Sequence, residues 1–128
     1  MTAHLRKALV IDDAVTVRMY HRYLIESHGW EVIEAENGVE GIEKALETAV
    51  DIILVDVNMP VMDGYSFIKM ARASENIGQV PIVMISTEAQ LVDRDKAFSA
   101  GANHYLVKPA KPADIAGLLD LLGEKERV

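Results

Sequence analysis

The chain has 128 residues, the usual size of a single domain. It contains no cysteine, which excludes disulfides, thiolate zinc sites and a cysteine nucleophile. Its 20 acidic and 13 basic residues give a net charge of −7, which disfavours binding to nucleic acid or an anionic membrane surface. The apolar runs are far shorter than the roughly 20 residues of a membrane span, and no signal peptide is recognisable. We therefore expect one cytoplasmic domain over residues 1–128, with its core at about residues 6–122 and no effector domain.

Short apolar runs alternate with helical patterns along the chain. Strands are predicted at residues 8–11, 31–35, 52–55, 82–85 and 104–107. Helices are predicted at residues 15–28, 38–49, 63–71, 89–100 and 113–122, with Gly29 and Gly101 ending the first and the fourth. The apolar stripe of the first helix is predicted to be Val17, Tyr20, Leu24 and Ile25.

Five strand–helix pairs in this order predict an α/β fold with right-handed crossovers. We expect a doubly wound, five-stranded parallel sheet in the order 2-1-3-4-5, the flavodoxin-like arrangement. Ligands of such sheets bind beyond the carboxyl ends of the strands, at the switch between the first and third strands. The residues that follow these strands are therefore the candidate functional residues.

The polar residues at the strand ends are expected to share one edge of the sheet; they are Asp12, Asp13, Asp56, Ser86, Thr87 and Lys108. Three carboxylates this close repel one another unless a cation compensates their charge. Mg²⁺ is the natural cation, because it prefers carboxylates, waters and phosphate oxygens. A softer metal has little to bind it, since the chain has no thiol and no histidine ends a strand at this edge.

Asp56 follows an apolar strand that is expected to be buried, so its position should be rigid, as a carboxylate nucleophile requires. Lys108 and the Ser86 hydroxyl are then placed to meet the oxygens of a transferring phosphoryl group. The strand ends alone therefore predict a Mg²⁺-assisted aspartyl-phosphate site.

Five motifs resemble those of the receiver domain of two-component response regulators, in its stand-alone, CheY-like (βα)5 form. They are Val10-Ile11-Asp12-Asp13, Val55-Asp56-Val57-Asn58-Met59-Pro60, Met62-Asp63-Gly64, Ile85-Ser86-Thr87 and Val107-Lys108-Pro109. They occur in the family's order and cover essentially the whole chain. Each motif alone is weak, and together they are highly specific.

The resemblance implies a role for each residue. Asp56 is the expected phosphoacceptor, and Lys108 is expected to bind a phosphoryl oxygen. Asp13, Asp56 and the backbone carbonyl of Asn58 are the expected direct ligands of Mg²⁺, and Asp12 is expected to bind it through a water.

Ser86 is the expected switch hydroxyl. Tyr105 occupies the place of the aromatic switch residue, which turns inward when Ser86 moves toward the phosphoryl group. The Lys108-Pro109 peptide bond is cis in the family, whereas sequence alone favours trans.

Three residues are expected to set the rate of phosphoryl hydrolysis. Asn58 and Glu88 match the residues of the fast-hydrolysing chemotaxis regulators of the family. Thr87 is bulkier than is usual there, and would narrow the access of a phosphodonor or of water. We expect a phosphoryl lifetime nearer minutes than hours.

The resemblance implies a signalling switch that is phosphorylated by a histidine kinase or phosphotransfer protein and turns over no external substrate. Its output is expected to be protein–protein contact of the chemotaxis type, with a phosphorelay intermediate or a phosphate sink as alternatives. The implied docking face is formed by the fourth helix, fifth strand and fifth helix; its charged and polar residues are Gln90, Arg94, Lys96, Lys111 and Asp114. From the residues alone, this face is ordinary solvated charge.

Two functions from other classes are weighed against this one. A haloacid-dehalogenase-like phosphatase also uses an aspartate nucleophile and Mg²⁺, but it needs Asp-x-Asp after the first strand and a cap insertion, which the sequence lacks. A flavodoxin-like electron carrier needs a phosphate-binding loop after the first strand, where Asp12 and Asp13 would repel phosphate.

Several other residues have simpler interpretations. Asp12 and Asp13 taken alone would be helix caps, and Asp63 is predicted to be a turn and cap without chemistry. His21 and His28 are predicted to be solvated surface histidines. Loop packing is expected for Met59 and Met62, and core positions are expected for Trp30 and Phe98.

Overall fold

The computed structural model describes residues 6–123, and five strands and five helices alternate through them. The strands are β1 (Lys7–Ile11), β2 (Glu31–Ala35), β3 (Ile52–Asp56), β4 (Ile82–Ser86) and β5 (His104–Val107). The helices are α1 (Val15–Glu26), α2 (Gly38–Glu47), α3 (Gly64–Ala73), α4 (Leu91–Ala100) and α5 (Pro112–Gly123). Every predicted element is present, and each of its ends lies within two residues of the predicted one.

All strand pairs are parallel, and the sheet order is β2-β1-β3-β4-β5. The predicted order is therefore confirmed, with the switch point between β1 and β3. β3 is buried along its whole length, as its apolar run predicted.

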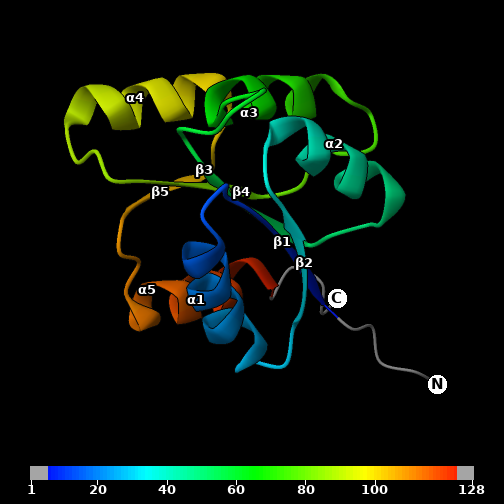
Figure 1. Cartoon of the computed structure of the whole chain (residues 1–128), viewed down its shortest axis with the longest axis vertical. Helices are drawn as coiled ribbons and strands as arrows, with labels where there is room; N and C mark the ends of the chain where they lie inside the picture. The colour runs from blue at the N-terminus through cyan, green and yellow to red at the C-terminus, as the bar shows by residue number, and fades with distance from the viewer. Residues whose placement is uncertain (1–5, 124–128) are drawn as a thin grey trace.

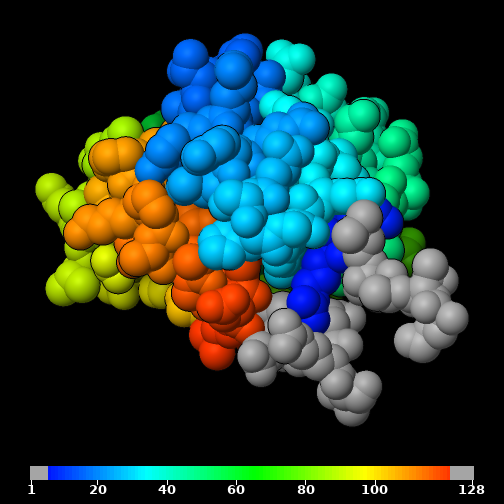
Figure 2. Space-filling view, turned by 90° about the horizontal axis from the view of Figure 1, so that it is seen from below, coloured from blue at the N-terminus to red at the C-terminus, as the bar shows by residue number. Residues whose placement is uncertain are grey.

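The helices form two layers, with α2, α3 and α4 on one face of the sheet and α1 and α5 on the other (Figure 1). Alternate residues of the strands belong to the two cores beneath these layers. In β1, Leu9 and Ile11 belong to the core that α2, α3 and α4 cover. Ala8 and Val10 belong to the core on the other face, under α1 and α5. Figure 2 looks onto this second face, where α1 in blue lies beside the orange and red chain of the β5–α5 region. Each fully buried aliphatic side chain in these cores contributes about 2 kcal/mol relative to an exposed one.

Side-chain caps fix the beginnings of two helices. Asn37 Oδ1 accepts from the backbone N–H of Glu40 at 2.9 Å and so caps α2. Asp63 Oδ1 accepts from the backbone N–H of Ser66 at 2.8 Å, which confirms the predicted cap of α3. Gly101 ends α4 with a φ of 119°, a left-handed conformation that glycine adopts without strain.

The prediction for the buried face of α1 is wrong by one residue over its first half. The buried residues are Arg18, His21, Leu24 and Ile25. His21 is 2% exposed, so its assignment to the surface is also wrong, whereas His28 is exposed as predicted. Apolar residues on the solvent side of the helix obscured the true face.

Phe98 is 45% exposed, which contradicts its predicted place in the core, while the prediction for Trp30 is confirmed. The buried residues of α4 are Ala97 and Ala100. Phe98 follows Ala97 and so lies about 100° around the helix from it, toward solvent.

Arg72 joins three segments at the edge of the sheet where β4 and β5 begin. Its guanidinium donates to the backbone carbonyls of Gly78 (3.0 Å), Val80 (2.7 Å) and Gly101 (2.9 Å). It also donates to Asn103 Oδ1 at 2.6 Å. The C-terminal end of α4 is thereby tied to α3.

Within residues 6–123, no helix is long and apolar enough to cross a membrane.

Candidate functional site

Three carboxylates and one ammonium meet at the carboxyl edge of the sheet. Asp12 and Asp13 follow β1, Asp56 ends β3, and Lys108 follows β5. Carboxylate oxygens of the three aspartates lie within 4.8 Å of one another. Lys108 Nζ lies 2.9 Å from Asp12 Oδ2 and 2.9 Å from Asp56 Oδ1. The structure therefore brings together four of the residues that were predicted from the strand ends.

The charges of this cluster are only partly compensated. Burial raises the pKa of Asp56, and the charge of Asp12 adds to this, while the hydrogen bond from Lys108 acts in the opposite direction. Burial disfavours the charged form of Lys108, but its hydrogen bonds to Asp56 and Asp12 outweigh burial and raise its pKa. One ammonium is thus shared between two buried carboxylates, with a third carboxylate close by.

Asp12 is bonded through all of its polar atoms. Its backbone N–H donates to the carbonyl of Ala35 at 3.1 Å, and its carbonyl accepts from Arg18 Nη1 at 2.6 Å. Its Oδ1 accepts from the N–H of Ala14 at 2.9 Å, and its Oδ2 accepts from Lys108. The N-cap residue of α1 is Ala14, and no side chain caps the helix. The interpretation of Asp12 as only a helix cap is therefore wrong.

The donor set fits a hard divalent cation. Asp13 is exposed, and its side chain makes no hydrogen bond to any part of the chain that the structure describes. Both oxygens of Asp12 already accept hydrogen bonds, which fits a residue that would reach a cation through water. Asn58 lies two residues after Asp56 in an exposed loop position, and its carbonyl stays a predicted ligand.

Ser86 and Tyr105 meet at the backbone of Glu88. Ser86 ends β4 and is 1% exposed, and its Oγ accepts from the N–H of Glu88 at 3.0 Å. Tyr105 is buried on β5, and its hydroxyl donates to the carbonyl of Glu88 at 2.6 Å. The two predicted switch residues therefore bind the same residue, Ser86 at the N–H of Glu88 and Tyr105 at its carbonyl.

The loop after β3 packs closely against the end of that strand. Gly64 donates its N–H to the carbonyl of Val57 at 2.8 Å. A Cβ on Gly64 would lie 2.2 Å from the backbone oxygen of Asp56, so only glycine fits there. Met59 and Met62 are partly buried against the core, which confirms the prediction of loop packing.

A cavity of about 480 Å³ opens beside the cluster, between α1 and the segment that follows β5. Its lining residues are Thr16, Val17, Tyr20, His21, Thr87, Lys108 and Pro109. The hydroxyl of Tyr20 donates to the carbonyl of Ala110 at 2.7 Å and so ties α1 to this segment. The Lys108–Pro109 bond is cis, as the family resemblance implied and sequence alone did not.

Arg18, His21 and Glu34 are site neighbours that the sequence did not reveal. Burial lowers the pKa of His21, and the charge of Lys108 acts in the same direction, while Asp12 opposes it. Arg18 Nε donates to Glu34 Oε1 at 2.9 Å. The spacing of Arg18, His21 and Ile25 on one face of α1 was the available signal, but polar residues at core positions break the apolar pattern.

Comparisons with known proteins agree with this geometry. The sequence model of the family described as "Response regulator receiver domain" matches residues 8–120. The chemotaxis protein CheY1 of Helicobacter pylori (strain J99 / ATCC 700824) is 38% identical over 119 residues, which cover 91% of this chain and 95% of that protein.

Solved structures are also similar. The chemotaxis protein CheY4 of Vibrio cholerae superposes with a TM-score of 0.87 at 33% identity, over 93% of this chain and 99% of that one. The receiver domain of the sensor histidine kinase PA1611 from Pseudomonas aeruginosa PAO1 has a TM-score of 0.85 at 30% identity, over 94% and 99% of the two chains. That structure has a magnesium ion coordinated in its active-site cleft.

Proposed function

The chain belongs to the family of response regulator receiver domains, and on this basis we propose that it is a phosphorylation switch whose acceptor is Asp56. The observation that carries the proposal is the position of Lys108 Nζ, 2.9 Å from the carboxylates of both Asp12 and Asp56. A fixed ammonium beside a fixed carboxylate, at the switch point of a parallel sheet, suits phosphoryl transfer. Receiver domains are signalling modules, which argues against the phosphatase and electron-carrier alternatives.

The proposed reaction moves a phosphoryl group from a histidine to an aspartate. A carboxylate oxygen of Asp56 attacks the phosphorus of a phosphohistidine on a kinase or phosphotransfer protein. The P–O bond to Asp56 forms as the P–N bond breaks, and the electron pair of that bond remains on the imidazole. Hydrolysis later transfers the phosphoryl group to water and restores the carboxylate.

Each charged residue has a part in this reaction. Lys108 would leave its contact with the Asp56 carboxylate and bind a phosphoryl oxygen, neutralising part of its charge. Asp13, Asp56 and the Asn58 carbonyl would hold Mg²⁺, with Asp12 acting through water. The bound ion would supply positive charge against the remaining charge of the phosphoryl group. The cluster of three aspartates and the magnesium ion in the PA1611 receiver domain support this assignment.

The proposed response begins at Ser86. Its hydroxyl would turn from the Glu88 N–H toward a phosphoryl oxygen, and the segment that Tyr105 also holds would follow. Output would then occur by protein–protein contact through α4, β5 and α5, where Leu91 and Val92 are exposed at 76% and 65%. The proposed setting is the cytoplasm, with a chemotaxis-type target.

The phosphoryl lifetime would distinguish chemotaxis-type signalling or a phosphate sink from a phosphorelay intermediate. Asn58, Thr87 and Glu88 are the proposed tuning residues, and all three are exposed. Decay of the phosphorylated protein within minutes after removal of the donor is expected. A lifetime of many hours would favour a relay intermediate instead.

The test is an intact-mass measurement after incubation with Mg²⁺ and acetyl phosphate. The wild type is expected to gain one phosphoryl group, and the gain should disappear in Asp56→Asn and in the presence of EDTA. An unmodified wild type, with the donor shown to be intact, would contradict the proposal. So would equal labelling of the Asp56→Asn variant, because the acceptor would then lie elsewhere.

A further inference from the structure

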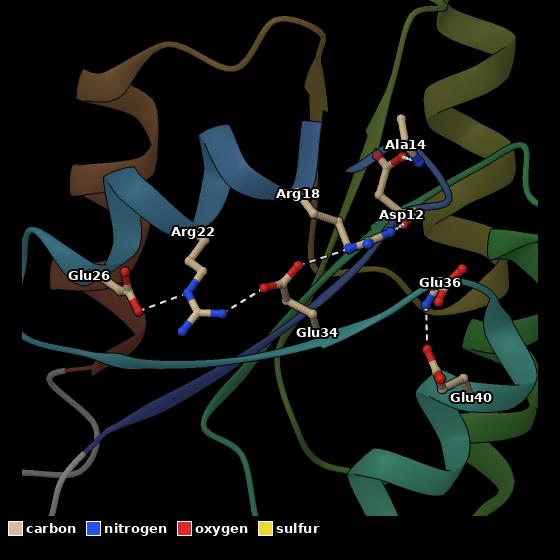
Figure 3. A network of polar contacts seen from close by, with 8 residues as sticks. All are labelled: Asp12, Ala14, Arg18, Arg22, Glu26, Glu34, Glu36 and Glu40. Atoms are coloured by element: carbon tan, nitrogen blue, oxygen red, sulfur yellow. Dashed lines mark hydrogen bonds and ion pairs between the residues drawn. The ribbon is translucent and has the colours of Figure 1, made fainter. Parts of the chain in front are cut away.

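Arg18 reaches the acidic cluster from the side of α1 that faces β2 (Figure 3). It is a buried cation, only 9% exposed, in the first half of the helix. Its Nη1 donates to the backbone carbonyl of Asp12 at 2.6 Å, and its Nε donates to Glu34 Oε1 at 2.9 Å. One guanidinium thus connects β2, α1 and the end of β1.

The carbonyl that Arg18 holds belongs to the peptide between Asp12 and Asp13. Because a peptide unit is planar, fixing this oxygen fixes the orientation of the whole unit and the position of the next Cα. The N–H of Asp12 is held by Ala35 from the other side. The hydrogen bond from Arg18 to the Asp12 carbonyl therefore fixes the backbone that leads into Asp13.

Asp13 depends on this backbone more than its neighbour does. The side chain of Asp12 is fixed by Ala14 and Lys108. That of Asp13 is exposed and has no hydrogen-bond partner within residues 6–123. Its carboxylate nevertheless lies within 4.8 Å of the other two carboxylates. Its place in the cluster follows from where the backbone points it.

Glu34 keeps the guanidinium of Arg18 in position. Burial opposes the ionised form of Glu34, but hydrogen bonds from Arg22 and Arg18 outweigh burial and lower its pKa. Arg22 Nη1 donates to Glu34 Oε2 at 2.6 Å, and Arg22 Nε donates to Glu26 at 2.9 Å. Glu34 therefore stays charged near neutral pH and binds both arginines, as the dashed lines of Figure 3 show.

We propose that Arg18 is a positioning residue for the cation site: anchored by Glu34, it orients the Asp12–Asp13 peptide so that the Asp13 carboxylate can bind the cation. This inference rests on the proposed function, because it requires that the cluster binds Mg²⁺. It assigns the residue a role through backbone geometry and not through contact with the cation.

Charge and geometry make opposite predictions for Arg18. A positive charge close to the cluster repels a divalent cation, so its removal would strengthen Mg²⁺ binding if charge were the only effect. Loss of the oriented peptide would weaken binding instead. A lysine keeps the charge but lacks the planar fork that holds Glu34 and Asp12 together. The sign of the change in affinity therefore separates the two roles.

The experiment is a Mg²⁺ titration of the metal-free full chain, without a phosphodonor, followed by backbone amide shifts. Arg18→Gln and Arg18→Lys are each expected to bind Mg²⁺ about tenfold more weakly than the wild type. Arg22→Gln is the matched control, since Arg22 also binds Glu34 but donates no hydrogen bond to Asp12 within the residues that the structure describes. Its affinity is expected to stay within about twofold of the wild type.

Urea midpoints measured in EDTA show whether each variant is folded. If Arg18→Gln does not fold, Arg18→Lys and Glu34→Gln decide, and weaker binding by both supports the proposal. Tighter or unchanged Mg²⁺ binding by the folded Arg18 variants would overturn it. Absence of Mg²⁺ binding by the wild type would overturn the proposed function itself. The two failures are distinguishable, because this one is seen in the wild type and the failure of the proposal for Arg18 is seen only in the variants.

Discussion

The ammonium of Lys108 lies 2.9 Å from the carboxylate of Asp56. The same ammonium lies 2.9 Å from Asp12, so one positive charge serves two carboxylates that are almost fully buried. Lys108 therefore supports the fold of the metal-free protein as well as the chemistry proposed for it.

Replacing Lys108 with Met should lower the free energy of unfolding by about 2–3 kcal/mol at pH 7, because two buried carboxylates lose their counter-ion. The loss should be smaller at pH 5. The pKa of Asp56 is raised by burial, and it would rise further without the ammonium. A raised carboxyl pKa in the folded state destabilises above that pKa, and the penalty fades as the group takes up its proton.

Urea denaturation in EDTA at the two pH values measures this effect. Lys111→Met is the control, because Lys111 is exposed three residues further along the chain. Equal loss of stability in both variants would show that the ammonium of Lys108 has no special part in the fold.

Replacing Asp13 with Asn should stabilise the metal-free protein by about 0.5–1 kcal/mol, because it removes one of three clustered negative charges. The same change should abolish most of the stabilisation that saturating Mg²⁺ gives the wild type. Thermal melting with and without Mg²⁺ measures both effects. Asp95→Asn, on the exposed side of α4, should leave the response to Mg²⁺ unchanged; an Asp13→Asn variant that responds like the wild type would exclude Asp13 as a ligand.

Replacing Gly64 with Ala should cost at least about 2 kcal/mol, because the new Cβ would lie 2.2 Å from the backbone oxygen of Asp56. Either β3 or α3 must move, so the proposed phosphorylation of Asp56 by acetyl phosphate should also slow. Gly117→Ala is the matched control: a Cβ there meets nothing within 4 Å, and the helix should gain about 0.5–1 kcal/mol. Denaturation midpoints that shift equally in the two variants would contradict the close packing at Gly64.

His21 should make stability depend on pH between neutrality and weak acid. Burial lowers its pKa in the folded state. The unfolded chain therefore binds more protons as the pH falls below about 6.5, and stability falls with it. A His21→Leu variant should show a shallower fall over this range, whereas the exposed His28→Gln variant should follow the wild type. Parallel stability curves for the wild type and His21→Leu would refute the assignment.

The residues of the cluster were predictable because each one lies at the end of a strand or within two residues after it. Apolar runs fix the ends of β1, β3 and β5, and the parallel order places Asp12, Asp56 and Lys108 at one edge. Local sequence is sufficient for this kind of site.

The support of the cluster was not predictable in the same way. Arg18 and His21 occupy buried positions of α1, while Val15 and Met19 on the same helix are exposed. The apolar pattern therefore placed the first half of the buried face at Val17 and Tyr20, one residue before the buried Arg18 and His21, while its second half at Leu24 and Ile25 was right. The partner of Arg18 is Glu34 on β2, and only the folded chain brings the two together.

Helix α4 is attached to the rest of the domain mainly at its C-terminal end. Ala97 and Ala100, its buried residues, lie near its C-terminal end, where Arg72 also holds the carbonyl of Gly101. At 1.5 Å per residue, the ten residues of α4 extend about 15 Å from this attached end. The other end joins the segment that Ser86 holds through Glu88. A small shift of that segment would rotate α4 about its C-terminal end. The exposed N-terminal end of the helix would then move most, and the sheet would not need to move.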